Sequence, residues 1–315
     1  MSATVVPAAT SPAQPLRLSQ PRRRKRRDGR TAFFFLLPNA VGFLVFTLTP
    51  LVASLVLSLF AWPLTGKSSF VGFGNYVDLF SKDASFRAAI VNTLYYVAAY
   101  VPLNVAVALG VALWLKGYSR SRRILRVIFF VPVLTPLVAD AVVWSLILTT
   151  RNGLVDSVIH AIFRVQGPEW LSAPQWAMPS IIIVAVWQGF GYNMLLFTAG
   201  LHAIPETFYD AAQIDGASKW RTFRSVTIPL LSPSLFFGIV LTVITSFQVF
   251  DLVYVLTDGG PGTSSTTIVY WLFEKGFNDY AMGYASAIAW VLFLIVIVIT
   301  AAQMRLQRRW VFYES

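Results

Sequence analysis

Cysteine is missing from the 315-residue sequence, and histidine occurs only twice. A chain without thiols forms no disulfides, thiolate metal sites or cysteine nucleophiles. His160 and His202 lie far apart and have no acidic, serine or metal-ligand partner at motif spacing, so neither a catalytic centre nor a metal site is indicated. Charged residues make up only 12% of the chain, against roughly 25% in soluble domains. Water is therefore not the main solvent of this protein.

Apolar residues dominate instead, at 56% of the sequence, with a mean hydropathy of +0.64. Six stretches have the roughly 20 mostly apolar residues that a helix needs to cross a bilayer. They are approximately 33–60, 88–115, 127–149, 178–201, 235–256 and 284–304. The first is too long for the apolar part of a signal peptide, about 7–15 residues, so we expect it to be retained. The sequence predicts an all-α integral membrane protein with six transmembrane helices.

The net charge of +11 would suit a nucleic-acid-binding protein, but the basic residues follow the predicted sides of the membrane. With a cytoplasmic N-terminus, the inside segments hold 19 of the 25 Lys and Arg residues, and the outside segments hold six. Basic residues favour the cytoplasmic side, so both termini are predicted to be cytoplasmic, with lipid and not nucleic acid as the partner. Residues 1–32 are predicted to be a basic, disordered cytoplasmic tail, and 33–310 to be the six-span domain.

The segment 202–233, between the fourth and fifth stretches, is too long and too patterned for a simple turn. Pro205 suits the first position of a helix, and Gly216 would end that helix in a left-handed conformation. Ser218 can cap a second helix. Two prolines are expected to end the second helix before the fifth span, namely Pro229 and Pro233.

Small and apolar side chains line this predicted helix–turn–helix. Phe208, Ala211 and Ala212 share one face of the first helix, and Trp220 and Phe223 lie on the second. An exposed surface of this kind usually has a protein partner. The alternative is that both short helices lie flat on the bilayer or pack beneath their own spans.

The run Asp210-Ala211-Ala212, followed by Gly216 and by Ile228-Pro229, resembles the EAA signature of ABC importer permeases. The extended pattern, with Asp-Gly-Ala-x-x-Trp-x-x-Phe, resembles the carbohydrate-uptake branch, which includes maltose, multiple-sugar and glycerol-3-phosphate importers. The signature usually begins with Glu, so Asp210 keeps the charge but is one methylene shorter. The resemblance implies a set of ATPase-coupling residues: Asp210, Ala211, Ala212, Asp215, Gly216, Trp220, Phe223 and Pro229.

The resemblance covers most of the chain, from about residue 33 to 309. It implies the type I importer permease fold, with a cytoplasmic coupling helix pair between spans four and five. It also implies a complex in a prokaryotic cytoplasmic (inner) membrane, made of this chain, a second homologous permease subunit, an ABC ATPase dimer and an extracytoplasmic solute-binding protein. This chain would bind no cofactor, and ATP and Mg²⁺ would bind in the ATPase subunits. Its nearest approach to a P-loop, at 66–68, has Ala61 where the pattern needs glycine.

Polar residues within the apolar stretches are the remaining signal, because they often mark a transport path. Amides can donate to and accept from the hydroxyl groups of a solute. The predicted path residues are Gln188, Asn193, Gln248, Asp251 and Tyr254. Packing within the core explains each of them nearly as well. Asp140 is better explained as a partner for backbone groups that Pro136 leaves free.

A secondary transporter or channel that works alone is the alternative function. Secondary transporters often show inverted repeats with broken helices in both halves, and the first and last three predicted spans show no such symmetry. The resemblance instead predicts a permease subunit, not an enzyme, that forms half of the translocation path for a sugar or sugar-like solute. The sequence leaves the identity of that solute open.

Overall fold

The computed structural model describes residues 25–63, 67–117, 119–151 and 153–312, without the side chains of 25–32 and 309. Two compact units divide the chain, 1–53 and 54–315, and each is described by itself. Most of the predicted tail, 1–24, lies outside the described residues.

A run of helix begins in the first unit, inside the stretch that was predicted to be a tail. α1 (Lys25–Phe43) continues through a π-helical turn, η1 (Leu44–Leu48), into α2 (Thr49–Leu57). The π turn lies directly before Pro50, which has no N–H for the helix. Leu44 O accepts from both the Thr49 backbone N–H and the Thr49 hydroxyl, the latter at 2.9 Å. This run supplies the first apolar span, Phe33–Leu57.

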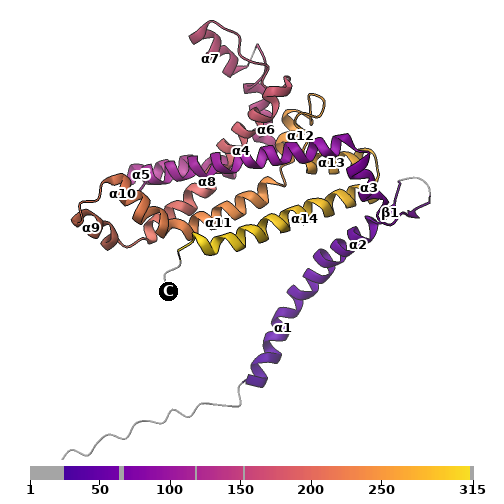
Figure 1. The fold of residues 1–315 in the computed structure, drawn as a ribbon, viewed down its shortest axis with the longest axis horizontal. Coiled ribbons are helices and arrows are strands. Elements are labelled where there is room, and N and C mark those ends of the chain that lie inside the picture. Colours follow the sequence, from indigo (N-terminus) through magenta and orange to yellow (C-terminus); the bar gives the residue numbers. More distant parts are fainter. Residues whose placement is uncertain (1–24, 64–66, 118, 152, 313–315) are drawn as a thin grey trace, which may run out of the picture. The chain divides into compact units, whose positions relative to one another are not determined.

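Four long helices lie side by side in the second unit (Figure 1). They are α4 (Ala84–Trp114), α8 (Pro174–Ala203), α11 (Ile228–Ser246) and α14 (Met282–Leu306). In α8, 56% of the most apolar window is buried inside the structure, against 22% in α4 and in α14. α8 is therefore the central helix, and the outer helices keep apolar faces that lipid can cover.

One buried polar junction ties α4, α8 and α11 together. The Asn193 amide donates to Asn104 Oδ1 and to Thr242 Oγ1, both at 2.7 Å. Thr242 in turn donates to Gly238 O at 2.7 Å, and Asn104 donates to Tyr100 OH at 3.2 Å. Because hydrocarbon offers no hydrogen-bond partners, buried amides must find them inside the bundle. The junction therefore fixes how these three helices are aligned.

The third apolar stretch is broken, whereas one helix over 127–149 was predicted. α5 (Arg120–Leu134) and α6 (Leu137–Ile147) meet at an angle of 96°. Pro136 disfavours helical backbone at the residue before it, and Thr135 is accordingly extended, with φ −77° and ψ 143°. The described residues thus hold five long apolar helices, or up to six spans if the bent pair counts as one.

Side chains satisfy the groups that this break leaves free. The Thr135 hydroxyl donates to Pro132 O at 2.6 Å and also contacts the Asp140 carboxylate. Asp140 therefore meets the Thr135 side chain at the break, whereas a backbone partner was predicted for it.

The fifth stretch ends earlier than predicted. α11 ends at Ser246, and α12 (Asp251–Leu256) follows after a break at 247–250. Thr267 Oγ1 donates to Val249 O at 3.1 Å, which satisfies a carbonyl that the break frees. A hydroxyl from a distant part of the chain therefore makes this interruption possible.

Short elements complete the second unit. They are strands β1 (Phe60–Ala61) and β2 (Ser69–Phe70), helices α3 (Gly74–Ser81), α7 (Leu154–Phe163) and α13 (Ile268–Phe273), the π turn η3 (Glu274–Asn278) and the 3₁₀ turn η4 (Gln307–Arg309). β1 and β2 are antiparallel, with Phe60 opposite Phe70.

Candidate coupling and translocation sites

A helix pair projects from one end of the bundle, α9 (Glu206–Ile214) and α10 (Lys219–Thr222) (Figure 1). Gly216 lies between them with φ +68°, the left-handed conformation predicted for it. The Ser218 hydroxyl accepts from Arg221 N–H at 3.3 Å and caps α10. The structure therefore contains both helices and the turn that the sequence predicted.

The end of the second helix was predicted wrongly. α10 continues through a π turn, η2 (Phe223–Thr227), into α11, so Lys219–Ser246 is one apolar run of helix that passes Pro229 and Pro233. The π turn before Pro229 shifts the hydrogen-bonding register of the helix, with Ile228 N–H on Phe223 O. α10 is consequently continuous with the fifth span through this π turn.

Large apolar side chains on this pair face solvent. Ile214 is 86% exposed, Trp220 68% and Phe208 42%. Among the predicted coupling residues, the exposed ones are Asp210, Ala211, Asp215, Gly216 and Trp220, and the half-buried ones are Ala212, Phe223 and Pro229. Their role in coupling stays a prediction, but apolar exposure of this size at the end of a bundle marks an interaction surface.

Tyr209 attaches α9 to the rest of the bundle, and sequence reasoning missed it. The Lys116 ammonium lies 3.6 Å from the centroid of the Tyr209 ring. Thr227 Oγ1 lies 3.5 Å from Tyr209 OH.

A second contact that sequence reasoning missed joins α4 to α5. Arg126 donates to Leu115 O at 2.6 Å and so holds the end of α4 against α5. Only the tertiary contacts identify these residues, because their sequence separations carry no pattern.

A cavity of about 210 Å³ lies among α4, α6, α8 and the break that follows α11. Gln188 of α8, Gln248 of the break and Asp251 of α12 all line it, so three predicted path residues come together. Tyr96 and Tyr100 form the wall from α4, with ring centroids 5.2 Å apart and planes 10° apart. Amides, a carboxylate and aromatic hydroxyls supply both donors and acceptors for a polyhydroxylated solute. Sequence reasoning missed the two tyrosines, although their i, i+4 spacing places them on one helix face.

The two other predicted path residues lie outside this cavity. Asn193 is 2% exposed and belongs to the buried junction of α4, α8 and α11. Tyr254 is 44% exposed and packs against Phe250 and Phe273, with ring centroids 5.3 and 5.4 Å away. Contact of Asn193 and Tyr254 with the solute stays a prediction. In this conformation neither side chain lines the cavity.

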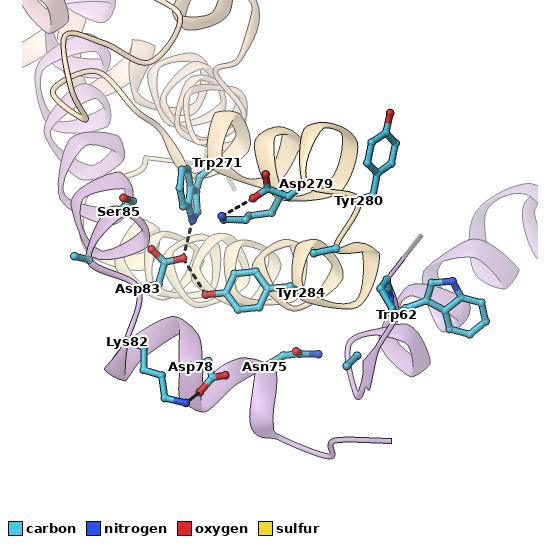
Figure 2. A pocket seen from close by; sticks show the side chains of 15 residues that line it. Trp62, Asn75, Asp78, Lys82, Asp83, Ser85, Trp271, Asp279, Tyr280 and Tyr284 are labelled. Carbon is cyan, nitrogen blue, oxygen red and sulfur yellow. Dashed lines mark hydrogen bonds and ion pairs between the residues drawn. The ribbon is translucent and has the colours of Figure 1, made fainter. Parts of the chain in front are cut away.

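A larger pocket, of about 770 Å³, lies at the end of the bundle opposite α9 and α10 (Figure 2). Asp83 stands in its wall, directly before α4. Its Oδ1 accepts from Phe86 N–H at 2.8 Å, and its Oδ2 accepts from Trp271 Nε1 and Tyr284 OH, each at 2.9 Å. One carboxylate thereby joins the start of α4 to α13 and α14.

Two ion pairs flank this pocket, Lys82 with Asp78 at 2.7 Å and Lys275 with Asp279 at 2.6 Å. Sequence reasoning missed the pocket because its residues come from segments far apart in the chain, around 61–63, 75–85 and 271–284. Within the ranges that the structure describes, no group of three His, Asp or Glu side chains is arranged to hold a metal ion. The binding of ATP and Mg²⁺ in other subunits stays a prediction.

These features define a class of protein. Apolar outer faces, a polar cavity between spans and an exposed helix pair joined to one span are the parts of a membrane permease subunit. A family model described as "Binding-protein-dependent transport system inner membrane component" matches residues 104–312. The chain belongs to this family, and within it to the carbohydrate-uptake branch of ABC transporter permeases. It is a multi-pass inner membrane component and not the catalytic subunit, which leaves the stand-alone transporter or channel without support.

Two curated relatives cover nearly the whole chain. The "Probable ABC transporter permease protein YesP" of Bacillus subtilis (strain 168) is 35% identical over 293 residues, covering 92% of this chain and 94% of the relative. The "Trehalose/maltose transport system permease protein MalF" of Thermococcus litoralis is 33% identical over 286 residues, covering 90% and 96%.

A solved structure has the same fold. It is a chain of a bacterial alginate ABC transporter in complex with an alginate pentasaccharide-bound periplasmic protein. The TM-score is 0.78 at 22% identity, with 90% of this chain and 96% of that chain covered. At this identity the likeness establishes the fold alone.

Proposed function

We propose that this permease subunit forms half of the translocation path for a sugar or sugar-like solute, and that a second homologous permease forms the other half. The chemistry of the 210 Å³ cavity supports a polyhydroxylated solute, because Gln188, Gln248 and Asp251 offer amides and a carboxylate beside two stacked tyrosines. The name of the Thermococcus relative, a trehalose/maltose permease, points to the same class of solute.

One observation carries the proposal. The helix that starts in the exposed pair at Lys219 runs unbroken to Ser246, and Ser246 lines the cavity. A push on α9 and α10 would therefore be transmitted along this continuous helix to the wall of the solute path. In the proposed cycle, an ABC ATPase dimer docks on α9 and α10, ATP binding closes that dimer, and α11 moves with it.

The remaining partners follow from the topology. The basic asymmetry predicts that α9 and α10 lie in the cytoplasm, where an ATPase could reach them. The opposite end of the bundle then faces outward, toward a solute-binding protein that delivers the solute. The support for this partner is the family to which the chain belongs, whose transport depends on a binding protein.

The cavity is tested by two substitutions, Gln188→Leu and Gln248→Leu. Each removes hydrogen-bonding groups from the cavity wall at nearly constant volume, so uptake of the solute is expected to fall at least several-fold while the amount of assembled complex stays constant. Gln166→Leu is the matched control, because Gln166 is exposed and does not line the cavity. Uptake is measured in vesicles that contain equal amounts of each variant.

Unchanged uptake in both cavity variants would show that the cavity is not part of the path. Docking is tested separately, by asking whether an ABC ATPase co-purifies with the chain from its native membrane. Failure of this co-purification under conditions that preserve uptake would contradict the proposed ATPase coupling and leave the cavity result standing.

A further inference from the structure

α7 stands beyond α6, away from the bundle of α4, α8, α11 and α14 (Figure 1). Its ten residues, Leu154–Phe163, turn three different faces outward because successive residues are 100° apart on a helix. Each face has its own composition: one is apolar and exposed, one is polar and exposed, and one is packed against the chain itself. The exposed apolar face therefore needs a partner outside the described chain.

Residues in the first turns of the packed face contact other parts of the chain. Asp156 is 4% exposed, and its carboxylate accepts from Gly167 N–H at 2.5 Å. A Cβ built on Gly167 would lie 3.4 Å from Ile159 Cδ1. Val155 packs on a core cluster that includes residues of α8 and α12. These contacts fix the rotation of α7 about its axis, so its other two faces are held in defined directions.

The apolar face is a stripe at i, i+4 and i+8. Leu154 is 66% exposed, Val158 49% and Ile162 67%. Ser157 and His160 lie on the polar face and are exposed as well. A helix with one aliphatic stripe and one polar face is built for a boundary between apolar and aqueous surroundings.

The helix before α7 carries a similar exposed apolar stripe. On α6, exposed apolar residues recur at the same spacing: Val138 is 53% exposed, Val142 48% and Leu146 68%. α6 belongs to the bent apolar pair that it forms with α5, whereas α7, at about 15 Å long, is only about half the thickness of the hydrocarbon core. α7 therefore cannot cross the bilayer on its own, and its exposed stripe follows that of α6 along the chain.

Cations stand at both ends of the helix. Arg151 precedes α7 and Arg164 ends it in a left-handed conformation, with φ 56° and its N–H on His160 O at 2.9 Å. Both arginine side chains are exposed. Guanidinium groups that flank an aliphatic stripe complement the phosphates of lipid headgroups above the acyl chains.

We propose that α7 is an interfacial helix that binds the lipid surface, with Leu154, Val158 and Ile162 among the acyl chains and Arg151 and Arg164 at the headgroup phosphates. It anchors the segment between the third and fourth spans to the bilayer. With the proposed topology, the leaflet that α7 binds is the outer one, and this part of the proposal rests on that topology. The contact with lipid itself does not.

The absence of native cysteine makes a direct test simple. Single-cysteine variants at Leu154, Val158 and Ile162 are spin-labelled, and the assembled complex is placed in nanodiscs of phosphatidylethanolamine and phosphatidylglycerol. Matched controls on the polar face are Ser157→Cys and His160→Cys. Collision rates of each label with oxygen, which concentrates in lipid, and with a water-soluble nickel chelate are measured by electron paramagnetic resonance.

Labels on the stripe are expected to show an oxygen-to-nickel ratio several-fold above that of the polar-face labels, near that of Val298→Cys in α14. A nickel-dominated signal on the stripe would place it in water and overturn the proposal. Low collision rates with both reagents would overturn it equally, by showing that a protein such as the second permease covers the stripe.

A second measurement needs no variant. The unmodified complex is photolabelled with a phospholipid that carries a diazirine in its acyl chain, and the labelled peptides are mapped by mass spectrometry. Label on peptide 153–165 is expected at a level similar to that on α14. Strong labelling of α14 without labelling of this peptide would contradict the proposal even if every cysteine variant failed to assemble.

Discussion

Asp83 accepts hydrogen bonds from three donors on separate elements, Phe86 N–H, the Trp271 indole and the Tyr284 hydroxyl. As the cap of α4 it satisfies an N–H that every helix start leaves free. As the acceptor for the indole and the hydroxyl it holds α13 and α14 to that helix start. A single carboxylate thus determines how one end of the bundle closes.

Asp83→Ala is expected to destabilise the protein, because each half-buried donor that loses its acceptor costs about 1–3 kcal/mol. The measurement is the thermal unfolding midpoint of the purified chain in detergent. Asp78→Ala is the control, since its exposed pair with Lys82 contributes about 0–1 kcal/mol. Equal midpoints for the two variants would show that Asp83 does not join these elements.

Gly216 is the residue on which the geometry of α9 and α10 depends. Its φ is +68°, and a Cβ built there would meet nothing within 4 Å. The expected effect of Gly216→Val is therefore backbone strain without a clash, about 1–2 kcal/mol. Strain of this size leaves the chain inserted but tilts α10, so ATPase docking should weaken and uptake should be lost. The measurement pairs uptake with ATPase co-purification at equal amounts of inserted chain.

Gly216→Asn is the matched control, because asparagine tolerates the left-handed region better than other residues with a Cβ. It should retain most uptake. Asp210→Ala on the adjacent α9 is expected to reduce uptake, whereas Asp210→Glu restores the usual residue of the signature and should be tolerated. Full uptake by Gly216→Val would mean that the helix pair is a passive loop.

The junction at Asn193 acts at the scale of helices, because it aligns α4, α8 and α11. Asn193→Leu would leave Asn104 Oδ1 and Thr242 Oγ1 without their shared donor. Side-chain hydrogen bonds between membrane helices contribute about 0.6–2 kcal/mol each, so the unfolding midpoint is expected to fall. Thr245→Val is the control, because the Thr245 hydroxyl bonds only to carbonyls of its own helix.

If Asn193→Leu abolished uptake without changing the unfolding midpoint, the result would instead support a role for Asn193 in the solute path. The same measurements on Thr242→Val should follow Asn193→Leu, because that variant removes an acceptor of the same amide.

Proline shows why element boundaries were only partly predictable. Pro136 breaks the third stretch, whereas Pro229 and Pro233 lie inside a continuous run of helix, and Pro102 lies inside α4. The rule that proline removes an N–H is the same at each position. The outcome differs because the Thr135 hydroxyl meets the Pro132 carbonyl at the first break, while a π turn precedes Pro229.

At the scale of the whole molecule, the prediction concerns the membrane topology, which reporter fusions can test. Fusions at Lys82, Gly167 and Gly276 are expected to read as outside, and a fusion at Gly117 as inside, because 19 of 25 basic residues lie on the predicted inner side. The position that decides is Gly167. The 96° bend between α5 and α6 is compatible with a broken span or a re-entrant loop. A cytoplasmic reading there would refute the six-span topology.

The resemblance of its signature to that of ABC importer permeases indicated the family. The sequence by itself also determined the membrane class, the approximate places of the spans and the helix pair with its glycine turn. Each of these depends on local quantities: apolar run length, i, i+4 spacing, a cap residue and a glycine at one φ. The tertiary structure alone decided the bend in the third span, the continuity of α10 with α11, the meeting of Gln188 with Gln248 and Asp251, and the burial of Asn193. These features depend on which distant side chains satisfy a freed backbone group or a buried amide, and no local pattern records such partners.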